Sequence, residues 1–502
     1  MLRNIGSNWF VMAVTGLATF FLMPFNLAHI GKEQYGLWLV ISALTAYLYL
    51  LHLGVPMASV RQMTQAIAAG DTLKLNRIVS SCAVMYLALG LLVVALGIPV
   101  MMFFERTYSI PDELRSSAHW AFVLSLAHTG LVFIAYMPYA ILSANQAFVP
   151  LNLLLAAAIV MRIAVNIALV LWFSNLMMLG AVILSVTVFE FIISWGYVLR
   201  KYPMIRPKLR YFQLETIKEI FGFSVYVFLM ALGGQLAFQT SALVIGHYMT
   251  NADVVSFAIP NSLMVILMQF LSGIAAVIMP MTTNLQTTDN KTELRAILYK
   301  WTKISLALSW CVGLFLLIFG PSFLAFWIQG AYHPESGRAL RILMLSYLVF
   351  LPIRGVAVPM LMGLGKAKWP TLATLAAGAL NIFLSILWVK PYGIEGVAFG
   401  ALVPNLLLSA AMTYLVCREL DVSIKSYLSA ILPLSVIGGL AGLAILGWWH
   451  YVWHPSGWVG LGLAGVLTIV VSTAIWTGLV LRHDPHVTVP RLSDILRGRF
   501  SW

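Results

Sequence analysis

Two arginines and one glutamate lie inside apolar runs of the sequence, where charged side chains are costly and are therefore candidates for function. Arg162 occupies the middle of the run LLLAAAIVMRIAVNIALVLWF, and no other Asp, Glu, Lys or Arg occurs between Arg115 and Glu190. Arg354 lies in the run SYLVFLPIRGVAVPM. A guanidinium in such a place can bind an anionic group, and a carboxylate can pair with a cation or exchange a proton. The sequence therefore predicts Arg162 and Arg354 as substrate-binding residues and Glu190 as an ion-coupling residue.

The runs that contain Arg162 and Glu190 each have one polar face. At about 100° per residue, the residues that share these faces are Asn152, Arg162 and Asn166 in one run and Thr187, Glu190, Ser194 and Tyr197 in the other. If the two runs form neighbouring helices, Arg162 lies about 20 Å and Glu190 about 13 Å from the cytoplasmic end. The two side chains are then long enough to reach each other. Two interpretations stay open: an ion pair that fixes one helix to the other, or a cavity in which Arg162 binds an anion.

Small polar side chains form one stripe in the first apolar run and another in the run that begins near residue 221. The first stripe comprises Asn8, Thr15, Thr19 and Asn26, with His29 just beyond, and the second comprises Ser224, Gln235, Gln239 and Gly246. An offset of 220 residues relates Thr15 to Gln235 and makes the stripes plausible repeat mates. Such stripes either join helices through hydrogen bonds or line a water-filled lumen. In the second case Asn26, Gln235 and Gln239 are further substrate-binding residues.

The run that begins near residue 35 carries polar groups on one side, at Ser42, Thr45, Tyr49 and His52. It ends in LGVPMASVRQ, which places Arg61 at its cytoplasmic mouth. Arg61 either belongs to the positively charged flank of a membrane helix or contacts an anionic substrate that enters from the cytoplasm. We include Arg61 among the substrate-binding candidates.

The composition indicates what kind of elements must position these residues. The 502-residue chain is 61% hydrophobic and 9% charged, and apolar runs of spanning length recur from end to end. These features are typical of an all-α polytopic membrane protein, with about fourteen transmembrane helices. The helices are predicted to start near residues 7, 35, 79, 118, 149, 176, 221, 254, 298, 339, 369, 393, 428 and 456.

The distribution of basic residues predicts the orientation. Of the 30 Lys and Arg, 22 lie in segments on the side of the N-terminus, 6 lie in loops on the other side, and Arg162 and Arg354 lie within runs. This asymmetry predicts a multi-pass protein of the bacterial inner (plasma) membrane with both termini in the cytoplasm. The basic residues of these loops also account for the net charge of +13. They form no stripe with interleaved aromatic residues, so we expect no nucleic-acid partner.

Several chemistries lack their sequence signals. The three cysteines, Cys82, Cys311 and Cys417, have no metal-like spacing, and no His, Asp and Glu cluster resembles a metal site. The chain has no phosphate-binding glycine loop and no arrangement typical of a hydrolase. We therefore expect neither a metal nor another cofactor, and no enzymatic activity.

Weak internal similarity predicts a repeat. The run NIALVLWFSNLMMLGAV from Asn166 resembles NIFLSILWVKPYGIEGVAF from Asn381, and the offset of about six helices favours two parallel six-helix bundles. Two extra helices follow. The predicted division is an N-terminal bundle over residues 1–199, a basic cytoplasmic linker over 200–220, a C-terminal bundle over 221–417, helices 13 and 14 over 418–481, and a cytoplasmic tail over 482–502.

The beginning of the chain carries a recognisable motif. The stretch GKEQYGLWLVISALTAYLYLLHLGVPMASVRQ contains a Gly-x-x-x-Tyr-Gly turn after the first helix and a Gly followed by Arg at the end of the second, at Gly31, Tyr35, Gly36, Gly54 and Arg61. In these features the chain resembles the polysaccharide-export flippases, the O-antigen and exopolysaccharide translocases of the multidrug/oligosaccharidyl-lipid/polysaccharide (MOP) superfamily.

The resemblance implies two six-helix bundles around a central cavity. It implies alternating access that moves polyprenyl-pyrophosphate-linked oligosaccharide repeat units from the cytoplasmic to the periplasmic leaflet for cell-surface polysaccharide synthesis. Arg61, Arg162 and Arg354 would then meet pyrophosphate or acidic sugars. The implied partners are this lipid-linked oligosaccharide, membrane lipids, and polysaccharide polymerase or export proteins.

Two alternatives remain beside this function. One is a multidrug/cation antiporter of the same superfamily, and the other is a membrane polysaccharide polymerase or ligase, although the large periplasmic loop usual in such enzymes is absent from the sequence. The two extra helices resemble the lipid II flippase branch. The first helix lacks the charged residues expected of that branch, so a polysaccharide repeat unit is favoured over a peptidoglycan precursor.

Overall fold

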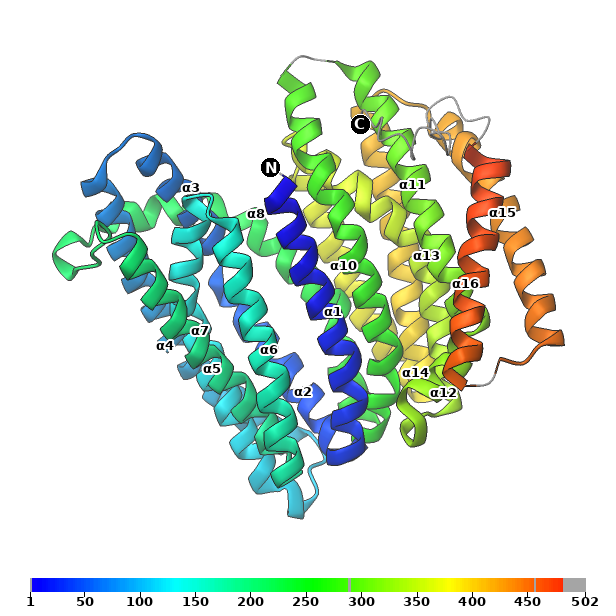
Figure 1. Ribbon diagram of the computed structural model, residues 1–502, viewed down its shortest axis with the longest axis horizontal. Coiled ribbons are helices and arrows are strands. Elements are labelled where there is room, and N and C mark those ends of the chain that lie inside the picture. The colour runs from blue at the N-terminus through cyan, green and yellow to red at the C-terminus, as the bar shows by residue number, and fades with distance from the viewer. Residues whose placement is uncertain (1, 288–289, 456, 482–502) are drawn as a thin grey trace. The chain divides into compact units, whose positions relative to one another are not determined.

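The computed structural model describes residues 2–287, 290–455 and 457–481, and these residues are almost entirely helical, with no strand among them (Figure 1). In chain order the helices are α1 (Leu2–Ile30), α2 (Lys32–Tyr49), α3 (Val55–Ala68), α4 (Thr72–Thr107), α5 (Asp112–Ala144), α6 (Phe148–Phe173), α7 (Leu176–Lys201), α8 (Leu214–Phe238), α9 (Thr240–Tyr248), α10 (Asn251–Thr287), α11 (Lys291–Ile318), α12 (Gly320–Ile328), α13 (Pro334–Gly363), α14 (Lys368–Glu419), α15 (Ile424–Val452) and α16 (Gly457–Ile475). Short helical turns are η1 (Leu50–His52), η2 (Leu209–Tyr211), η3 (Gln329–Ala331) and η4 (Trp476–Leu481). The predicted tail over 482–502 lies outside the described residues.

The number of membrane-spanning helices agrees with the prediction. Thirteen helical stretches in the described ranges are long and apolar enough to cross a membrane. One of them, α14, is 52 residues long and contains Gly393, whose φ of 57° and ψ of −139° are not helical. Counting both halves of α14 confirms the predicted number of about fourteen helices, and the interruption falls where the sequence predicts a helix start.

Several helices extend beyond their apolar runs because a polar side chain caps them. The third predicted helix starts at Thr72 rather than near residue 79, since Asp71 accepts a hydrogen bond from the backbone N–H of Lys74 at 2.8 Å. Asn290 likewise accepts a hydrogen bond from the backbone N–H of Glu293, and α11 begins at Lys291 rather than near residue 298. A cap satisfies backbone donors that the first helical turn leaves without a partner, so the helix can begin in polar sequence.

The Gly-x-x-x-Tyr-Gly motif has a packing role. Gly36 lies so close to the start of α10 that an added Cβ atom would meet the Asn251 carbonyl oxygen at 1.9 Å. The Asn251 amide also donates to Glu33 at 3.0 Å. At the other end of α2, Gly54 has a φ of 74°, a left-handed conformation that glycine adopts without strain. Gly36 therefore lets α2 approach the start of α10 closely, and Gly54 provides the backbone conformation that precedes α3.

Contacts between Cα atoms divide the chain into two compact units, Met1–Ala258 with Ser385–Gly393 and Ile259–Leu384 with Ile394–Trp502. In the first unit, α5 packs along α4 and α7, while α6 packs against α1 and α7. These are the helices that carry the candidate residues Asn26, Arg162 and Glu190. The repeat-based bundle boundaries stay a prediction.

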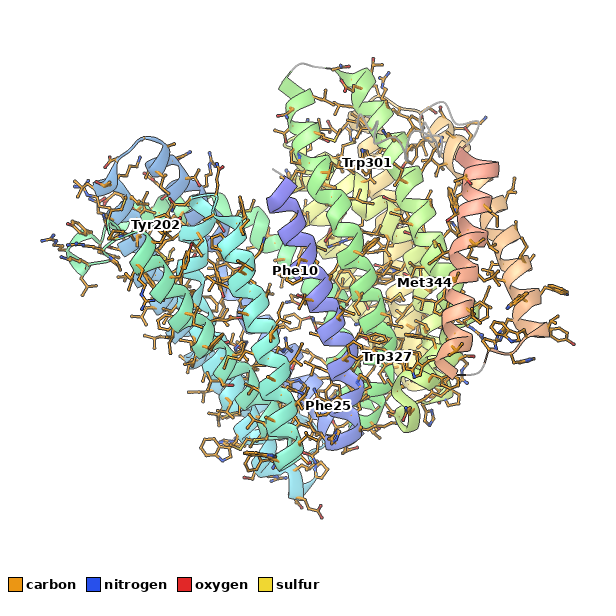
Figure 2. The ribbon with its side chains drawn as sticks, viewed as in Figure 1. Phe10, Phe25, Tyr202, Trp301, Trp327 and Met344 are labelled. Atoms are coloured by element: carbon orange, nitrogen blue, oxygen red, sulfur yellow. The ribbon has the colours of Figure 1, made fainter. Side chains whose placement is uncertain are left out.

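The segment between α7 and α8 is held against α4. In Figure 2, Tyr202 marks its beginning, just beyond the end of α7. Backbone N–H groups of this segment donate to side chains of α4: Arg206 to Asn76 at 2.6 Å, Lys208 to Ser80 at 3.0 Å and Gln213 to Ser81 at 2.9 Å. The predicted basic linker therefore follows a defined path along this unit.

In the second unit, α15 and α16 pack against α11. Their shared core contains Leu314, Phe319, Leu446, Leu461 and Ala464. Close approach depends on small residues, since a Cβ atom added to Gly439 would meet the Trp310 ring at 2.4 Å. The two extra helices are thus an integral part of this unit.

Candidate functional site

The first unit contains a cavity of about 450 Å³ between α2, α5, α6 and α7. Its polar lining residues are Ser42, Thr45, Tyr49, His128, Thr129, Arg162, Thr187 and Glu190. Apolar side chains, among them Trp38 and Val132, complete the wall. Concave sites of this size, with a few polar groups among apolar ones, are typical of small-molecule binding.

Arg162 and Glu190 share this cavity without a direct ion pair. Among the described residues, no carboxylate oxygen lies within 4.0 Å of the Arg162 guanidinium nitrogens. The guanidinium is nevertheless near enough for its charge to act on Glu190, on His128 and on Tyr35. Arg162 is also among the exposed residues of α6, so its charged group can meet a molecule that enters the cavity.

The hydroxyl groups of the wall are held by their own helices. Thr45 donates to the Ile41 carbonyl at 3.0 Å, and Thr129 donates to the Ser125 carbonyl at 2.8 Å. A hydroxyl that donates in this way keeps oxygen lone pairs that can accept a further hydrogen bond. The polar side predicted for the second helix therefore contributes acceptors to the cavity through Thr45 and Ser42.

His128 is a cavity residue that the sequence reasoning missed. Its Nδ1 atom lies 2.7 Å from the hydroxyl oxygen of Thr187, a residue of the predicted polar face of α7. The signal in the sequence was a histidine in the apolar run after residue 118. At about 100° per residue His128 shares one face of α5 with Ser125 and Thr129, so the periodicity that marks the polar face of Arg162 also marks His128. That the two faces meet follows only from the packing of the helices.

Asn26 lies elsewhere, in the contact between α1 and α6. It is buried, and its side-chain oxygen accepts a hydrogen bond from the buried Asn166 amide at 2.7 Å. Neither residue is part of the cavity wall described above. The side chains of Asn8 and Ser224, which begin the two predicted stripes, lie outside the described part of the chain.

Gln235 and Gln239 lie on the side of α8 and at its end. Gln235 donates to the Ala46 carbonyl of α2 at 3.3 Å, and its own carbonyl accepts from the Tyr47 hydroxyl at 3.2 Å. Tyr47 also shares a short hydrogen bond with Thr240. Gln239 is exposed at the C-terminal cap of α8. The structure thus joins Gln235 to the back of the helix that carries Thr45 and Tyr49.

Arg61 and Arg354 are separate from this cavity. Arg61 is exposed on α3. Arg354 belongs to α13 in the second unit, where its guanidinium lies 5.5 Å from the centre of the Phe350 ring. It borders a narrow crevice with Thr374 and Ser409 that leaves no room for a water-sized sphere. No group of three His, Cys, Asp or Glu in the described ranges could hold a metal ion.

The described residues thus form the apolar helices of a polytopic membrane protein, and four helices of its first unit enclose a cavity lined by charged groups. A model of the family described as polysaccharide biosynthesis protein matches residues 1–286, more than half of the chain. The chain therefore belongs to the polysaccharide biosynthesis protein family. No curated protein matched the chain in sequence.

Solved structures show the same fold. The chain is similar to the lipid II flippase MurJ in an inward closed conformation, with a TM-score of 0.71 and 14% identity over 95% of this chain and 99% of that one. An inward-facing multidrug resistance MATE family transporter of the MOP superfamily matches with a TM-score of 0.69 and 16% identity, over 82% of this chain and 96% of that one. A MOP superfamily transporter from Pyrococcus furiosus, described as having a binding pocket of reverse polarity, matches with a TM-score of 0.62 and 18% identity, over 84% of this chain and 96% of that one.

Proposed function

We propose that this protein is a flippase that moves polyprenyl-pyrophosphate-linked oligosaccharide repeat units from the cytoplasmic to the periplasmic leaflet by alternating access, for the synthesis of cell-surface polysaccharide. The observation that carries the proposal is the guanidinium of Arg162, which lines a cavity of about 450 Å³ in a chain of the polysaccharide biosynthesis family. Pyrophosphate and acidic sugars are anionic, and a guanidinium binds such groups through paired, charge-assisted hydrogen bonds.

The size of the cavity limits which part of the substrate it holds. A cavity of about 450 Å³ accommodates one small polar group rather than a whole lipid-linked oligosaccharide. The polyprenyl chain is apolar and gains nothing by leaving the bilayer. The substrate would therefore place its head group at Arg162 while its tail stays in lipid.

Glu190 supports the coupling of this movement to an ion. It lies in the same cavity as Arg162 without a direct ion pair between them, so its carboxylate can exchange a proton or cation as substrate arrives and leaves. The membrane gradient then supplies the driving force, and no covalent chemistry is required of the chain.

The other predicted residues take outer positions in this proposal. Arg61, exposed on α3, would meet the anionic head group as it arrives from the cytoplasm, and Arg354 would meet it in the second unit. Asn26, Gln235 and Gln239 would contact the substrate only in a conformation that exposes them. The proposal keeps both termini in the cytoplasm of a bacterial inner membrane, with polymerase or export proteins as downstream partners.

A specific observation also favours a second function. The carboxylate of Glu190 and the imidazole of His128 lie in one cavity, as a proton-coupled multidrug/cation antiporter would require. The guanidinium of Arg162 opposes this function, because it repels the cationic compounds that such a transporter would bind.

The test is the location of the lipid-linked repeat units. Cells that lack the protein should keep these units on the cytoplasmic face, where a membrane-impermeant glycosidase added outside cannot cleave them. Re-expression of the protein should restore cleavage. Normal external exposure of the units in the deleted cells, together with new sensitivity to cationic dyes, would contradict the flippase and support the antiporter.

A further inference from the structure

The cavity of the first unit contains the imidazole of His128, to which the proposed flippase function gives no role. It lines the same cavity as Arg162, and the aromatic side chains Trp38 and Tyr49 contribute to the wall. The inference below rests on the proposed function, since it takes Arg162 as the anion-binding group. It concerns which chemical group, in addition to the negative charge, the bound molecule must have.

The hydrogen bonds of Thr187 fix the proton on the imidazole. The Thr187 hydroxyl has a single hydrogen, which it donates to the Ile183 carbonyl at 2.9 Å. Its oxygen must therefore accept in the second contact, the 2.7 Å one to Nδ1 of His128. Nδ1 is consequently the protonated nitrogen, and in the neutral ring the other nitrogen, Nε2, carries a lone pair.

The charges of the wall are balanced when this ring is neutral. The lining contains one guanidinium, Arg162, and one carboxylate, Glu190. A second proton on His128 would add an unbalanced positive charge to a site that already holds a cation. The neutral ring therefore offers Nε2 as a hydrogen-bond acceptor. The ring also has a hydrogen bond with the backbone of Ile183, the residue whose carbonyl accepts from Thr187.

We propose that His128 is a specificity-determining residue whose Nε2 accepts a hydrogen bond from a hydroxyl group of the molecule that Arg162 binds. The cavity would then select a hydroxylated anion, that is, a sugar carrying a phosphate or a carboxylate, over an anion without hydroxyl groups. The hydroxyl must be a donor, because a neutral Nδ1-protonated imidazole has no second hydrogen to give. Trp38 and Tyr49 supply apolar ring surface for the C–H faces of the sugar.

Thr187 is the positioning residue for this acceptor. It is buried, with 3% of its surface exposed, and lies on α7, whereas His128 lies on α5. Replacing its hydroxyl by a methyl group would leave Nδ1 without its acceptor. The proton could then move to Nε2, which would turn the cavity nitrogen from an acceptor into a donor.

The experiment measures binding by the purified full-length protein in nanodiscs, with two pairs of probes. Glucose 1-phosphate is compared with cyclohexyl phosphate, which has the same charged group and a ring without hydroxyls. Glucuronate is compared with cyclohexanecarboxylate in the same way. The wild type should prefer the sugar of at least one pair about fivefold to tenfold, the range expected for one hydrogen bond. The pair that shows the preference identifies phosphate or carboxylate as the anion.

His128→Asn is the decisive variant, because the Asn amide reproduces the donor at the Nδ1 position but has nothing at the Nε2 position. It should bind the sugar probe no better than the cyclohexyl probe, while keeping the affinity for the latter. Thr187→Val should lose the preference too, and Thr187→Ser, which keeps the hydroxyl, should restore it. Thermal unfolding of each variant shows whether the protein remains folded.

The two proposals fail in different ways. An unchanged sugar preference in His128→Asn, or a wild type that binds both members of each pair equally or binds none of them, overturns the role of His128. Arg162→Ala tests the proposed function separately, since it should weaken binding of every probe. If Arg162→Ala binds the probes like the wild type, the anion site itself is wrong, whatever His128 does.

Discussion

The two arginines inside membrane helices have very different surroundings. Arg162 of the first unit lines a cavity of about 450 Å³ and shares it with a carboxylate, an imidazole and several hydroxyl groups. Arg354 of the second unit lies over the ring of Phe350 beside a crevice that has no room for a water molecule. An arginine in an apolar run can therefore either line a cavity or pack over an aromatic ring. What decides between them is the space and the polar groups that neighbouring helices provide.

The largest effect is expected at Arg162. Arg162→Ala should lower export about 100-fold, because truncating one partner of a charge pair that the bound head group buries costs about 3 kcal/mol. The amount of folded protein should not change, since the side chain is exposed to the cavity. Export is measured as cleavage of lipid-linked repeat units at the outer face.

Two matched variants accompany Arg162→Ala. Arg162→Lys keeps the charge but not the planar fork and should recover export in part. Arg115→Ala removes an exposed arginine that pairs with Asp112 near the start of α5, and should export normally. Loss of folded protein in Arg162→Ala would instead assign the arginine to the scaffold.

Exchanging the two charges sharpens the comparison within the first unit. The double variant Arg162→Glu, Glu190→Arg keeps the net charge and any attraction between the two positions. It should still lose export about 30-fold, because the anion would meet the wrong group at each position. Normal export by this double variant would show that the pair only joins α6 to α7. Thermal unfolding of the same protein indicates whether the exchange is tolerated.

A smaller effect is expected in the second unit. Arg354→Met removes the charge but keeps a long side chain over the Phe350 ring, so the protein should fold and lose export about fivefold, as for a contact worth about 1 kcal/mol. Arg354→Ala removes the packing as well and should also lower the melting temperature. If Arg354→Met exports like the wild type, the second arginine contributes packing alone, and the contrast with Arg162 becomes complete.

The hydrogen bond between Asn26 and Asn166 should affect stability rather than export. Asn166→Leu leaves the buried Asn26 amide without this partner and should destabilise the protein by about 1 kcal/mol. The double variant Asn26→Leu, Asn166→Leu removes both polar groups and should recover most of that loss. Thermal unfolding measures the difference. A strong export defect in a stable double variant would indicate that Asn26 contacts the substrate after all.

The smallest effect is expected at an exposed ion pair of the second unit, in the connection between α14 and α15. A hydrogen bond from Lys291 at 2.6 Å and the charge of that lysine hold the pKa of the Asp421 carboxyl below its usual range. Because the folded-state pKa is the lower one, the pair adds stability above the unfolded-state pKa, and this stability is lost as pH falls through the folded-state value.

The variant Asp421→Asn tests this pair. It should therefore lower the melting temperature slightly near pH 7, and the difference from the wild type should shrink as the pH falls through the lowered folded-state pKa of Asp421. A deficit that does not change with pH would mean that the aspartate acts through the backbone, where it has a φ of 51°, and not through its charge.

Hydropathy sufficed to predict the class of fold and the number of helices. A helix in lipid satisfies its backbone hydrogen bonds internally and exposes apolar side chains. Each span is therefore visible in the sequence as a long apolar run, whatever helices lie beside it. The interruption of α14 was predictable as well, because its 52 residues are enough for two spans and the chain must turn between them. Helix ends were harder, because the cap at Asp71 extends α4 into polar sequence.

The candidate site was predicted only in part, and α6 shows why. Asn166 and Arg162 lie one turn apart on what the sequence presents as a single polar face. In the folded protein Asn166 is buried against Asn26 of α1, whereas Arg162 opens into the cavity. A periodicity tells which residues share a side of a helix, but a face can border two neighbours, and only packing determines where one contact ends and the other begins.

The sequence by itself determined the membrane class, the helices, and the rarity of charge that made Arg162, Glu190 and Arg354 worth following. Only the tertiary structure decided that Arg162, Glu190 and His128 share one cavity and that Arg354 does not belong to it. The physical reason is that burial in lipid is a property of each segment, which local composition records. A cavity is the space that four separate helices leave between them, and no single segment contains that information.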